Sequence, residues 1–249
     1  MTNILILGGT TEASALAAAL ADRRIAATLS YAGRTANPRP QPVPVRIGGF
    51  GGVDGLIRYL RESRITHLID ATHPFAAQMS AHAVAAAEAA GVPLVALTRP
   101  PWTPGEGDRW TRVADLAGAV AALHGPARNI MLALGRMHVD AFAARPQHRY
   151  LLRFVDEPAE APALAHFDLV IDRGPFGVHG DRTLMEAHRI ELVVAKNAGG
   201  NGAAAKLEAA CALGLPVLMI DRPALPSRVE LHDVPAVLGW LGHAAVRGV

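Results

Sequence analysis

The chain has 249 residues, of which 51% are apolar and 18% are charged, so it carries enough apolar material for one large core or two smaller ones. The formal net charge of +2 is too small to indicate a nucleic-acid partner, and no stretch of about 20 residues is apolar enough to span a membrane. Cys211 is the single cysteine, which excludes an internal disulfide and favours a cytoplasmic protein.

Short apolar runs alternate with Ala-rich segments along the first hundred residues, which predicts strands alternating with helices. The expected elements are a strand at Asn3–Leu7, a helix at Thr11–Asp22, strands at Ile25–Ser30 and Val43–Ile47, a helix at Val53–Ser63, a strand at His67–Ala71, a helix at Phe75–Ala90 and a strand at Leu94–Leu97. Such alternation is typical of βαβ units with a parallel sheet.

The segment Arg99–Asp108 is rich in Pro and Gly, and it is the expected domain boundary. A second alternating series follows, with strands expected at Arg128–Leu134, Tyr150–Phe154, Leu169–Ile171, Leu192–Ala195 and Val217–Ile220, and helices at Ala114–Leu123, Asp181–His188, Ala203–Leu213 and Val234–Leu241. We therefore predict an α/β fold of two Rossmann-like domains, 1–100 and 101–249, each with a parallel sheet flanked by helices. Ligands of such folds sit at the carboxyl ends of strands, so the active site is expected in the cleft between the domains.

The segment Leu7–Ala13 follows the first expected strand and opens the first expected helix. Gly8 and Gly9 permit close approach of a phosphate, and the helix start offers unpaired N–H groups to it. The match to the dinucleotide pattern G-x-G-x-x-G/A is imperfect, since Thr10 stands at the middle glycine. The alternative is a tight turn in which Thr10 or Thr11 caps the helix.

Two further motifs lie at ends of expected strands in the first domain. Ser30 and Arg34 follow the second strand, where no Asp or Glu is present for a ribose hydroxyl, so Arg34 favours the 2′-phosphate of NADP over NAD. An ordinary solvated arginine is the alternative. Gly48 and Gly49 belong to a glycine-rich stretch that indicates either close approach to the adenosine half or a flexible connection.

Thr72 and His73 precede Pro74, which suits the first position of a helix. One of the two is therefore expected to cap that helix, and His73 is equally a candidate to donate a proton.

Both lysines of the chain, Lys196 and Lys206, flank a glycine loop that contains Gly199 and Gly200. This clustering indicates an anion site, for either a cofactor phosphate or a substrate carboxylate. Asp172 follows another expected strand of the second domain. The eleven histidines show no metal-binding spacing, so no metal is predicted.

Taken together, the motifs resemble the precorrin-6A reductase family of cobalamin biosynthesis, which includes cobalt-precorrin-6A reductases. The resemblance spans nearly the whole chain, and its motifs are Ile4–Ala13, Ser30–Arg34, Ala71–Ala76, Gly135-Arg136, Gly174–Phe176 and Lys196–Gly200. One departure is Ala198, where many relatives are expected to have serine.

The resemblance implies an oxidoreductase that uses NADPH to reduce the precorrin-6A macrocycle to precorrin-6B, with hydride added to C19 and a proton to C18. It implies a tetrapyrrole substrate, no nucleic-acid or membrane partner, and transient contacts with neighbouring pathway enzymes. The catalytic residues are expected to be His73, Asp172 and Lys196. The expected cofactor-binding residues are Gly8, Gly9, Thr10, Thr11, Glu12, Ser30, Arg34, Gly48, Gly49, Thr72, Gly199 and Gly200.

Two other functions fit paired Rossmann-like domains. A nucleotide-dependent transferase would bind a nucleoside diphosphate without nicotinamide, and a tetrapyrrole or nucleotide sensor would bind its ligand without turnover.

Overall fold

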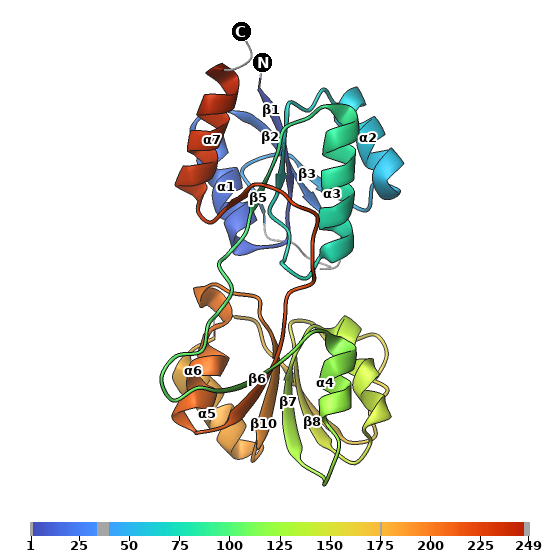
Figure 1. The fold of residues 1–249 in the computed structure, drawn as a ribbon, viewed down its shortest axis with the longest axis vertical. Helices are drawn as coiled ribbons and strands as arrows, with labels where there is room; N and C mark the ends of the chain where they lie inside the picture. The colour runs from blue at the N-terminus through green and yellow to red at the C-terminus, as the bar shows by residue number, and fades with distance from the viewer. Residues whose placement is uncertain (1, 34–39, 175, 247–249) are drawn as a thin grey trace. The chain divides into compact units, whose positions relative to one another are not determined.

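The computed structural model describes residues 2–33, 40–174 and 176–246. It separates into two compact units, the first formed by residues 1–100 with 224–249 and the second by 101–223. Within the described residues each unit contains one parallel sheet of six strands, with helices on its faces (Figure 1).

The sheet of the first unit has the strand order β12-β5-β4-β1-β2-β3. Its elements are β1 (Asn3–Leu7), α1 (Thr11–Asp22), β2 (Ala26–Tyr31), β3 (Val45–Ile47), α2 (Gly52–Glu62), β4 (His67–Asp70), α3 (Ala77–Ala90), β5 (Leu94–Leu97), β12 (Glu230–Leu231) and α7 (Val234–Val246). Alternate residues of β1 face opposite sides: Ile4 and Ile6 pack against α1 and α7, whereas Leu5 and Leu7 pack against α2 and α3. Both faces of the central strand are therefore buried, as its continuous apolar run predicts.

The sheet of the second unit has the order β6-β11-β10-β7-β8-β9. Its elements are β6 (Arg109–Val113), α4 (Leu116–Ala122), β7 (Asn129–Ala133), the 3₁₀ segment η1 (Arg136–Ala144), β8 (Arg149–Phe154), β9 (Phe167–Ile171), α5 (Val178–Ala187), β10 (Leu192–Lys196), the short 3₁₀ turn η2 (Asn201–Ala203), α6 (Ala205–Ala212) and β11 (Pro216–Ile220). Helices α5 and α6 cover one face of this sheet through a core that includes Met185, Leu207 and Met219. Helix α4 lies on the other face (Figure 1).

The structure confirms the predicted α/β class with two parallel sheets, and it differs from the expected extent of the second domain. The chain enters the second unit after Pro100, but residues 224–249 return to the first unit. There β12 pairs with β5 in parallel, with Glu230 opposite Ala96, and Val237 of α7 is fully buried in the first core. Pairing and burial with the first sheet therefore move these residues out of the expected 101–249 domain.

Two local expectations also need correction. Helix α3 begins at Ala77 with Ala76 as its cap residue, so Pro74 is not its first position and neither Thr72 nor His73 caps it. Strand β6 was not expected, because its Arg-Trp-Thr-Arg-Val sequence carries two charges beside the Pro- and Gly-rich segment.

Candidate functional site

The turn between β1 and α1 is held by Thr10. The Thr10 hydroxyl oxygen accepts a hydrogen bond from Ala13 N at 3.1 Å, so Thr10 is the cap of α1, and the hydroxyl donates to Ala71 O at 2.9 Å. Since its one hydrogen is directed at Ala71, Thr10 contributes to this turn by shaping it. The Thr11 hydroxyl is exposed and donates to the Glu12 carboxylate at 3.1 Å.

The same turn has the features that a phosphate group requires. Gly9 has φ +130°, and a Cβ placed there would have no atom within 4 Å, so space is open beside its backbone. The N–H groups of Thr11 and Glu12 lie in the first turn of α1, where a helix supplies no acceptor and its dipole is positive. The Arg99 guanidinium lies 3.7 Å from the Glu12 carboxylate and brings a cation to this position. These residues fit a pyrophosphate.

Beside the carboxyl end of β2, the neighbouring strand β3 carries an arginine that sequence reasoning missed. Arg46 of β3 lies 3.3 Å from the Oγ atom of buried Ser30 and donates to the carbonyl oxygens of Gly48 and Gly49. The Phe50 ring packs 3.8 Å from its guanidinium. Arg46 therefore orders the expected residues of this region, although nothing in its sequence position distinguishes it from an ordinary strand arginine. Arg34 lies outside the described residues.

The turn after β4 is ordered by Asp70. Its Oδ1 atom accepts from Thr72 N at 3.1 Å and from the Thr72 hydroxyl at 2.7 Å, and its Oδ2 atom pairs with Arg228. His73 Nδ1 accepts from Phe75 N at 3.2 Å. In a neutral imidazole with this acceptor the proton is on Nε2, so His73 carries its donor on that nitrogen.

The expected residues of the first unit meet at one edge of the sheet. Gly8 N donates to Ser30 O at 2.8 Å, Ala71 N donates to Leu7 O at 2.9 Å, and Gly48 N donates to Tyr31 O at 2.9 Å. The turns that carry Gly8–Glu12, Ser30, Gly48–Gly49 and Thr72–His73 are thus neighbours at the carboxyl ends of β1, β2, β3 and β4, where doubly wound sheets bind ligands.

The second unit separates two of the three expected catalytic residues. Lys196 ends β10, whereas Asp172 follows β9, and β7 and β8 lie between these strands. Three strand spacings correspond to about 14 Å, so the sheet does not bring Asp172 and Lys196 into contact. Asp172 is exposed, and the glycine loop with Gly199 and Gly200 follows Lys196 directly.

A second arginine of interest lies at the end of β8. The Arg153 guanidinium pairs with the buried Asp181 carboxylate of α5, and it lies 3.6 Å from the centre of the Phe176 ring. The Asp181 carboxylate and the Phe176 ring together fix the plane of the guanidinium. Phe176 belongs to a motif of the family resemblance and could have pointed to this region, but nothing in the sequence around Arg153 marks that residue.

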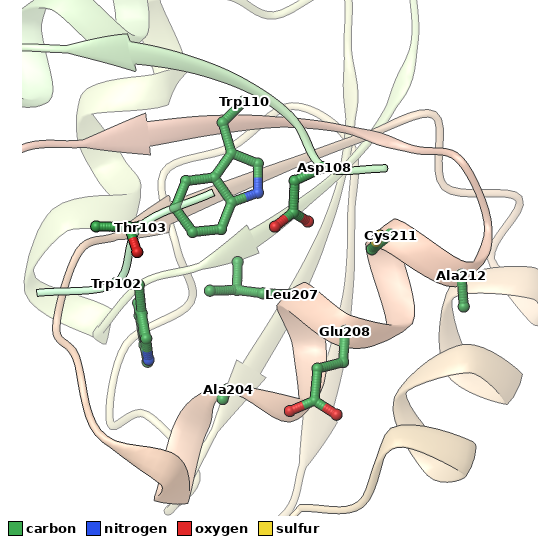
Figure 2. Close-up of a pocket in the computed structure, with 9 residues that line it drawn as sticks. All are labelled: Trp102, Thr103, Asp108, Trp110, Ala204, Leu207, Glu208, Cys211 and Ala212. Carbon is green, nitrogen blue, oxygen red and sulfur yellow. The ribbon is translucent and has the colours of Figure 1, made fainter. Parts of the chain in front are cut away.

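A cavity of about 450 Å³ is formed within the second unit by β6, α6 and the segment before β6 (Figure 2). It is lined by Trp102, Thr103, Asp108, Trp110, Ala204, Leu207, Glu208, Cys211 and Ala212. Burial and the nearby Asp108 raise the pKa of the Cys211 thiol, so this thiol is held protonated and is a weak nucleophile.

Two possible features are absent from the described part of the chain. No helix there is both long and apolar enough to cross a membrane. Nor does any group of three or more His, Cys, Asp or Glu side chains gather there in a way that could hold a metal ion.

The protein has two parallel sheets, and the turn between β1 and α1, at the carboxyl ends of the strands of the first sheet, suits a phosphate group. These features define a two-domain α/β protein of the Rossmann-like class. Residues 3–242 match the family model described as precorrin-6x reductase CbiJ/CobK. The chain belongs to this family, which confirms the resemblance seen in its motifs.

Individual relatives agree with this membership. The chain is 57% identical to the precorrin-6A reductase of Rhodobacter capsulatus, with 100% of both chains covered, and 49% identical to that of Rhodococcus erythropolis, with 97% and 98% covered. The cobalt-precorrin-6A reductase of Priestia megaterium is 28% identical, with 98% of both chains covered. A solved structure of CobK precorrin-6A reductase superposes with a TM-score of 0.94 at 57% identity, covering 98% of this chain and 97% of the other.

Proposed function

We propose that this protein is an NADPH-dependent precorrin-6A reductase of cobalamin biosynthesis, which forms precorrin-6B by adding hydride to C19 and a proton to C18. The observation that carries the proposal is the 57% identity to a precorrin-6A reductase along the full length of both chains. The open backbone at Gly9 and the first turn of α1 support it, since they suit the phosphates of a dinucleotide.

NADPH supplies the hydride, and the chain supplies binding and orientation. In the proposal, the N–H groups of Gly9, Thr11 and Glu12 bind the pyrophosphate, and Thr10 maintains the turn. Arg34 and Ser30 bind the 2′-phosphate, beside a Gly48–Gly49 backbone that Arg46 orders. Thr72 lies at the same edge and is held by Asp70.

The second unit is proposed to bind the acidic side chains of the macrocycle. Lys196 and the backbone at Gly199 and Gly200 form the anion site of this unit. We further propose His73 as the proton donor: its imidazolium form, reached when Nδ1 gives up the contact with Phe75 N and takes a proton, loses a proton from Nε2 and returns to the neutral ring. Asp172 or a bound water is the alternative donor.

The relatives favour a cobalt-free substrate. Those named precorrin-6A reductase are 44–57% identical to this chain, whereas those named cobalt-precorrin-6A reductase are 24–29% identical. The proposal therefore includes preferential turnover of the metal-free macrocycle, together with a cytoplasmic location and transient contacts with neighbouring pathway enzymes.

Reduction is tested by mixing the pure protein with NADPH and precorrin-6A and following NADPH absorbance, with cobalt-precorrin-6A as a parallel substrate. We expect NADPH oxidation that is faster with the metal-free compound. A folded protein that oxidises no NADPH with either compound refutes the reductase proposal.

Cofactor preference is tested separately by titrating NADPH and NADH. We expect NADPH to bind more tightly, and Arg34→Ala to remove most of the difference. Arg24→Ala is the matched control, because Arg24 is an exposed arginine before the amino end of β2. Equal binding of both cofactors by the unaltered protein, or an unchanged preference in Arg34→Ala, contradicts the 2′-phosphate role.

A further inference from the structure

The loop between β10 and α6, residues 197–203, is attached to Trp102 at two points. The buried Asn197 side chain accepts from Trp102 N at 2.7 Å through Oδ1 and donates to Trp102 O at 2.9 Å through Nδ2. The indole Nε1–H of Trp102 donates to Gly200 O at 2.9 Å. Trp102, which lies 95 positions before Asn197 in the sequence, thus fixes the loop at its first residue and at Gly200.

Arg222 holds the first two peptide groups of the loop. Its Nε atom donates to Asn197 O at 2.9 Å, and its Nη2 atom donates to Ala198 O at 3.0 Å. The planar guanidinium makes both bonds at once, which fixes the orientation of the two carbonyl groups relative to each other. Arg222 follows β11, the parallel neighbour of β10, so it is itself well placed by the sheet.

Lys206 holds the far end of the loop. Its ammonium donates to Ala203 O at 2.6 Å and lies 5.0 Å from the centre of the Trp102 ring, and the residue is buried. Trp102 therefore contacts the loop at Asn197 and Gly200, and its ring also lies beside Lys206, which contacts the loop at Ala203.

These bonds determine which backbone groups the loop presents. The carbonyl oxygens of Ala198 and Gly200 are directed at Arg222 and Trp102. In a trans peptide the N–H of the next residue points opposite to the carbonyl, so the N–H groups of Gly199 and Asn201 point away from these side chains. Gly199 and Gly200 adopt φ values of +70° and +75°, which let the chain reverse while this orientation is kept.

An anion is repelled by carbonyl oxygens and attracted by N–H groups, so a loop with its carbonyl groups turned inward is prepared for an anion. We propose that Trp102 and Arg222 are positioning residues that hold residues 197–203 in the shape that binds a phosphate or carboxylate of the cofactor or substrate. The proposal rests on the reductase function above, because it names what shapes the Lys196–Gly200 site.

Trp102→Phe is the central test, since it removes the indole N–H that contacts Gly200 and keeps an aromatic ring beside Lys206. Trp110→Phe is the matched control: Trp110 is also beside the cavity of Figure 2, and its Nε1 atom has no hydrogen-bond partner in the described chain. Calorimetry with NADP⁺ and KM for precorrin-6A are the two readouts, which distinguish a cofactor phosphate from a substrate carboxylate.

We expect Trp102→Phe to raise either the Kd for NADP⁺ or the KM for precorrin-6A about 5- to 10-fold, with kcat within about twofold of the unaltered enzyme. Trp110→Phe should leave both values unchanged. Arg222→Lys is the second variant, which keeps the charge and loses the paired donors, and it should raise the same binding constant as Trp102→Phe. Thermal melting monitors folding of each variant.

The proposal is overturned if both Trp102→Phe and Arg222→Lys bind both ligands as the unaltered protein does, or if they lose only thermal stability. These outcomes differ from failure of the reductase proposal, in which the unaltered protein binds NADP⁺ but does not turn over. In that case the NADP⁺ titrations of the variants still test the cofactor-phosphate role, and calorimetry with precorrin-6A in place of KM tests the substrate-carboxylate role. An unaltered protein that binds neither ligand overturns both proposals.

Discussion

Arg228 and Asp70 form a buried ion pair between residues 158 positions apart in the chain. Their side chains are 6% and 2% exposed. Asp70 also accepts both hydrogen bonds from Thr72, so the pair joins the returning C-terminal segment to the turn that carries Thr72 and His73. One end of the candidate site is therefore ordered by a residue that follows the entire second unit in sequence.

Replacing Arg228 should destabilise the protein strongly. Arg228→Met leaves the Asp70 carboxylate buried without its cation, and breaking a buried pair in this way costs about 3–5 kcal/mol of unfolding free energy. Urea unfolding measures the loss. The control is Arg112→Met, which removes an arginine that is 66% exposed in its pair with Asp221 and should barely move the midpoint. Equal midpoints for the two variants would contradict the importance assigned to burial.

Thr10→Val tests the double role of the Thr10 hydroxyl. The variant keeps the side-chain shape and loses the bonds to Ala13 N and Ala71 O, so we expect about 1–2 kcal/mol lower stability and weaker NADPH binding. Thr11→Val is the control for stability, because the Thr11 hydroxyl is exposed and its hydrogen bond goes to the side chain of its neighbour Glu12. Denaturation and NADPH titration are the measurements. A Thr10→Val protein as stable as Thr11→Val would show that the cap contributes little.

Replacing Gly55 or Gly180 by alanine should change the stability of the protein in opposite directions. A Cβ on Gly55 of α2 would lie 1.7 Å from the Phe50 carbonyl oxygen, so Gly55→Ala must displace backbone and should lower the melting temperature markedly. A Cβ on Gly180 of α5 would meet nothing within 4 Å, so Gly180→Ala should raise stability by roughly 0.5–1 kcal/mol. Thermal unfolding of both variants decides the matter, and a Gly55→Ala protein that melts with the unaltered one would contradict the tight approach.

Tyr150 should make stability fall at alkaline pH. Burial raises the pKa of its hydroxyl to about 12 from the ordinary value of 10.0. The unfolded chain therefore loses this proton at lower pH than the folded protein, so the free energy of unfolding falls as pH rises from 10 toward 12 and is independent of this group below that range. Subtracting Tyr150→Phe from the unaltered protein isolates the effect from other groups. A constant difference between the two from pH 8 to 11.5 would rule out this linkage.

The sequence predicts the fold well where periodicity and burial coincide. Ile4–Leu7 and Leu192–Ala195 are continuous apolar runs that require cover on both faces, and both are central strands. The sequence predicts the fold poorly where an element forms only because it pairs with a strand far away in the chain. Strand β12 contains two residues and exists because Glu230 and Leu231 lie opposite Ala96 and Leu97, a contact that no local pattern encodes.

The candidate site shows the same division. Glycine turns and motifs placed Gly8–Glu12, Ser30, Thr72 and the Lys196–Gly200 loop at strand ends, because parallel strands all end at one edge. The side chains that order these turns were missed. Arg46, Trp102, Arg222 and Arg228 act through backbone carbonyl groups or a buried carboxylate, and their roles depend on neighbours that only the folded chain supplies.

The return of residues 224–249 to the first sheet has a consequence for biosynthesis. On the ribosome, residues 1–100 emerge before β12 and α7 have been made. Strand β5 therefore lacks its outer neighbour β12, and the first core lacks α7, until translation has passed through residues 101–223 and reached these last elements. The first unit must wait with an open sheet edge while the second is synthesised, and a gene fragment that encodes residues 1–100 alone would yield a nascent domain prone to pair through that edge.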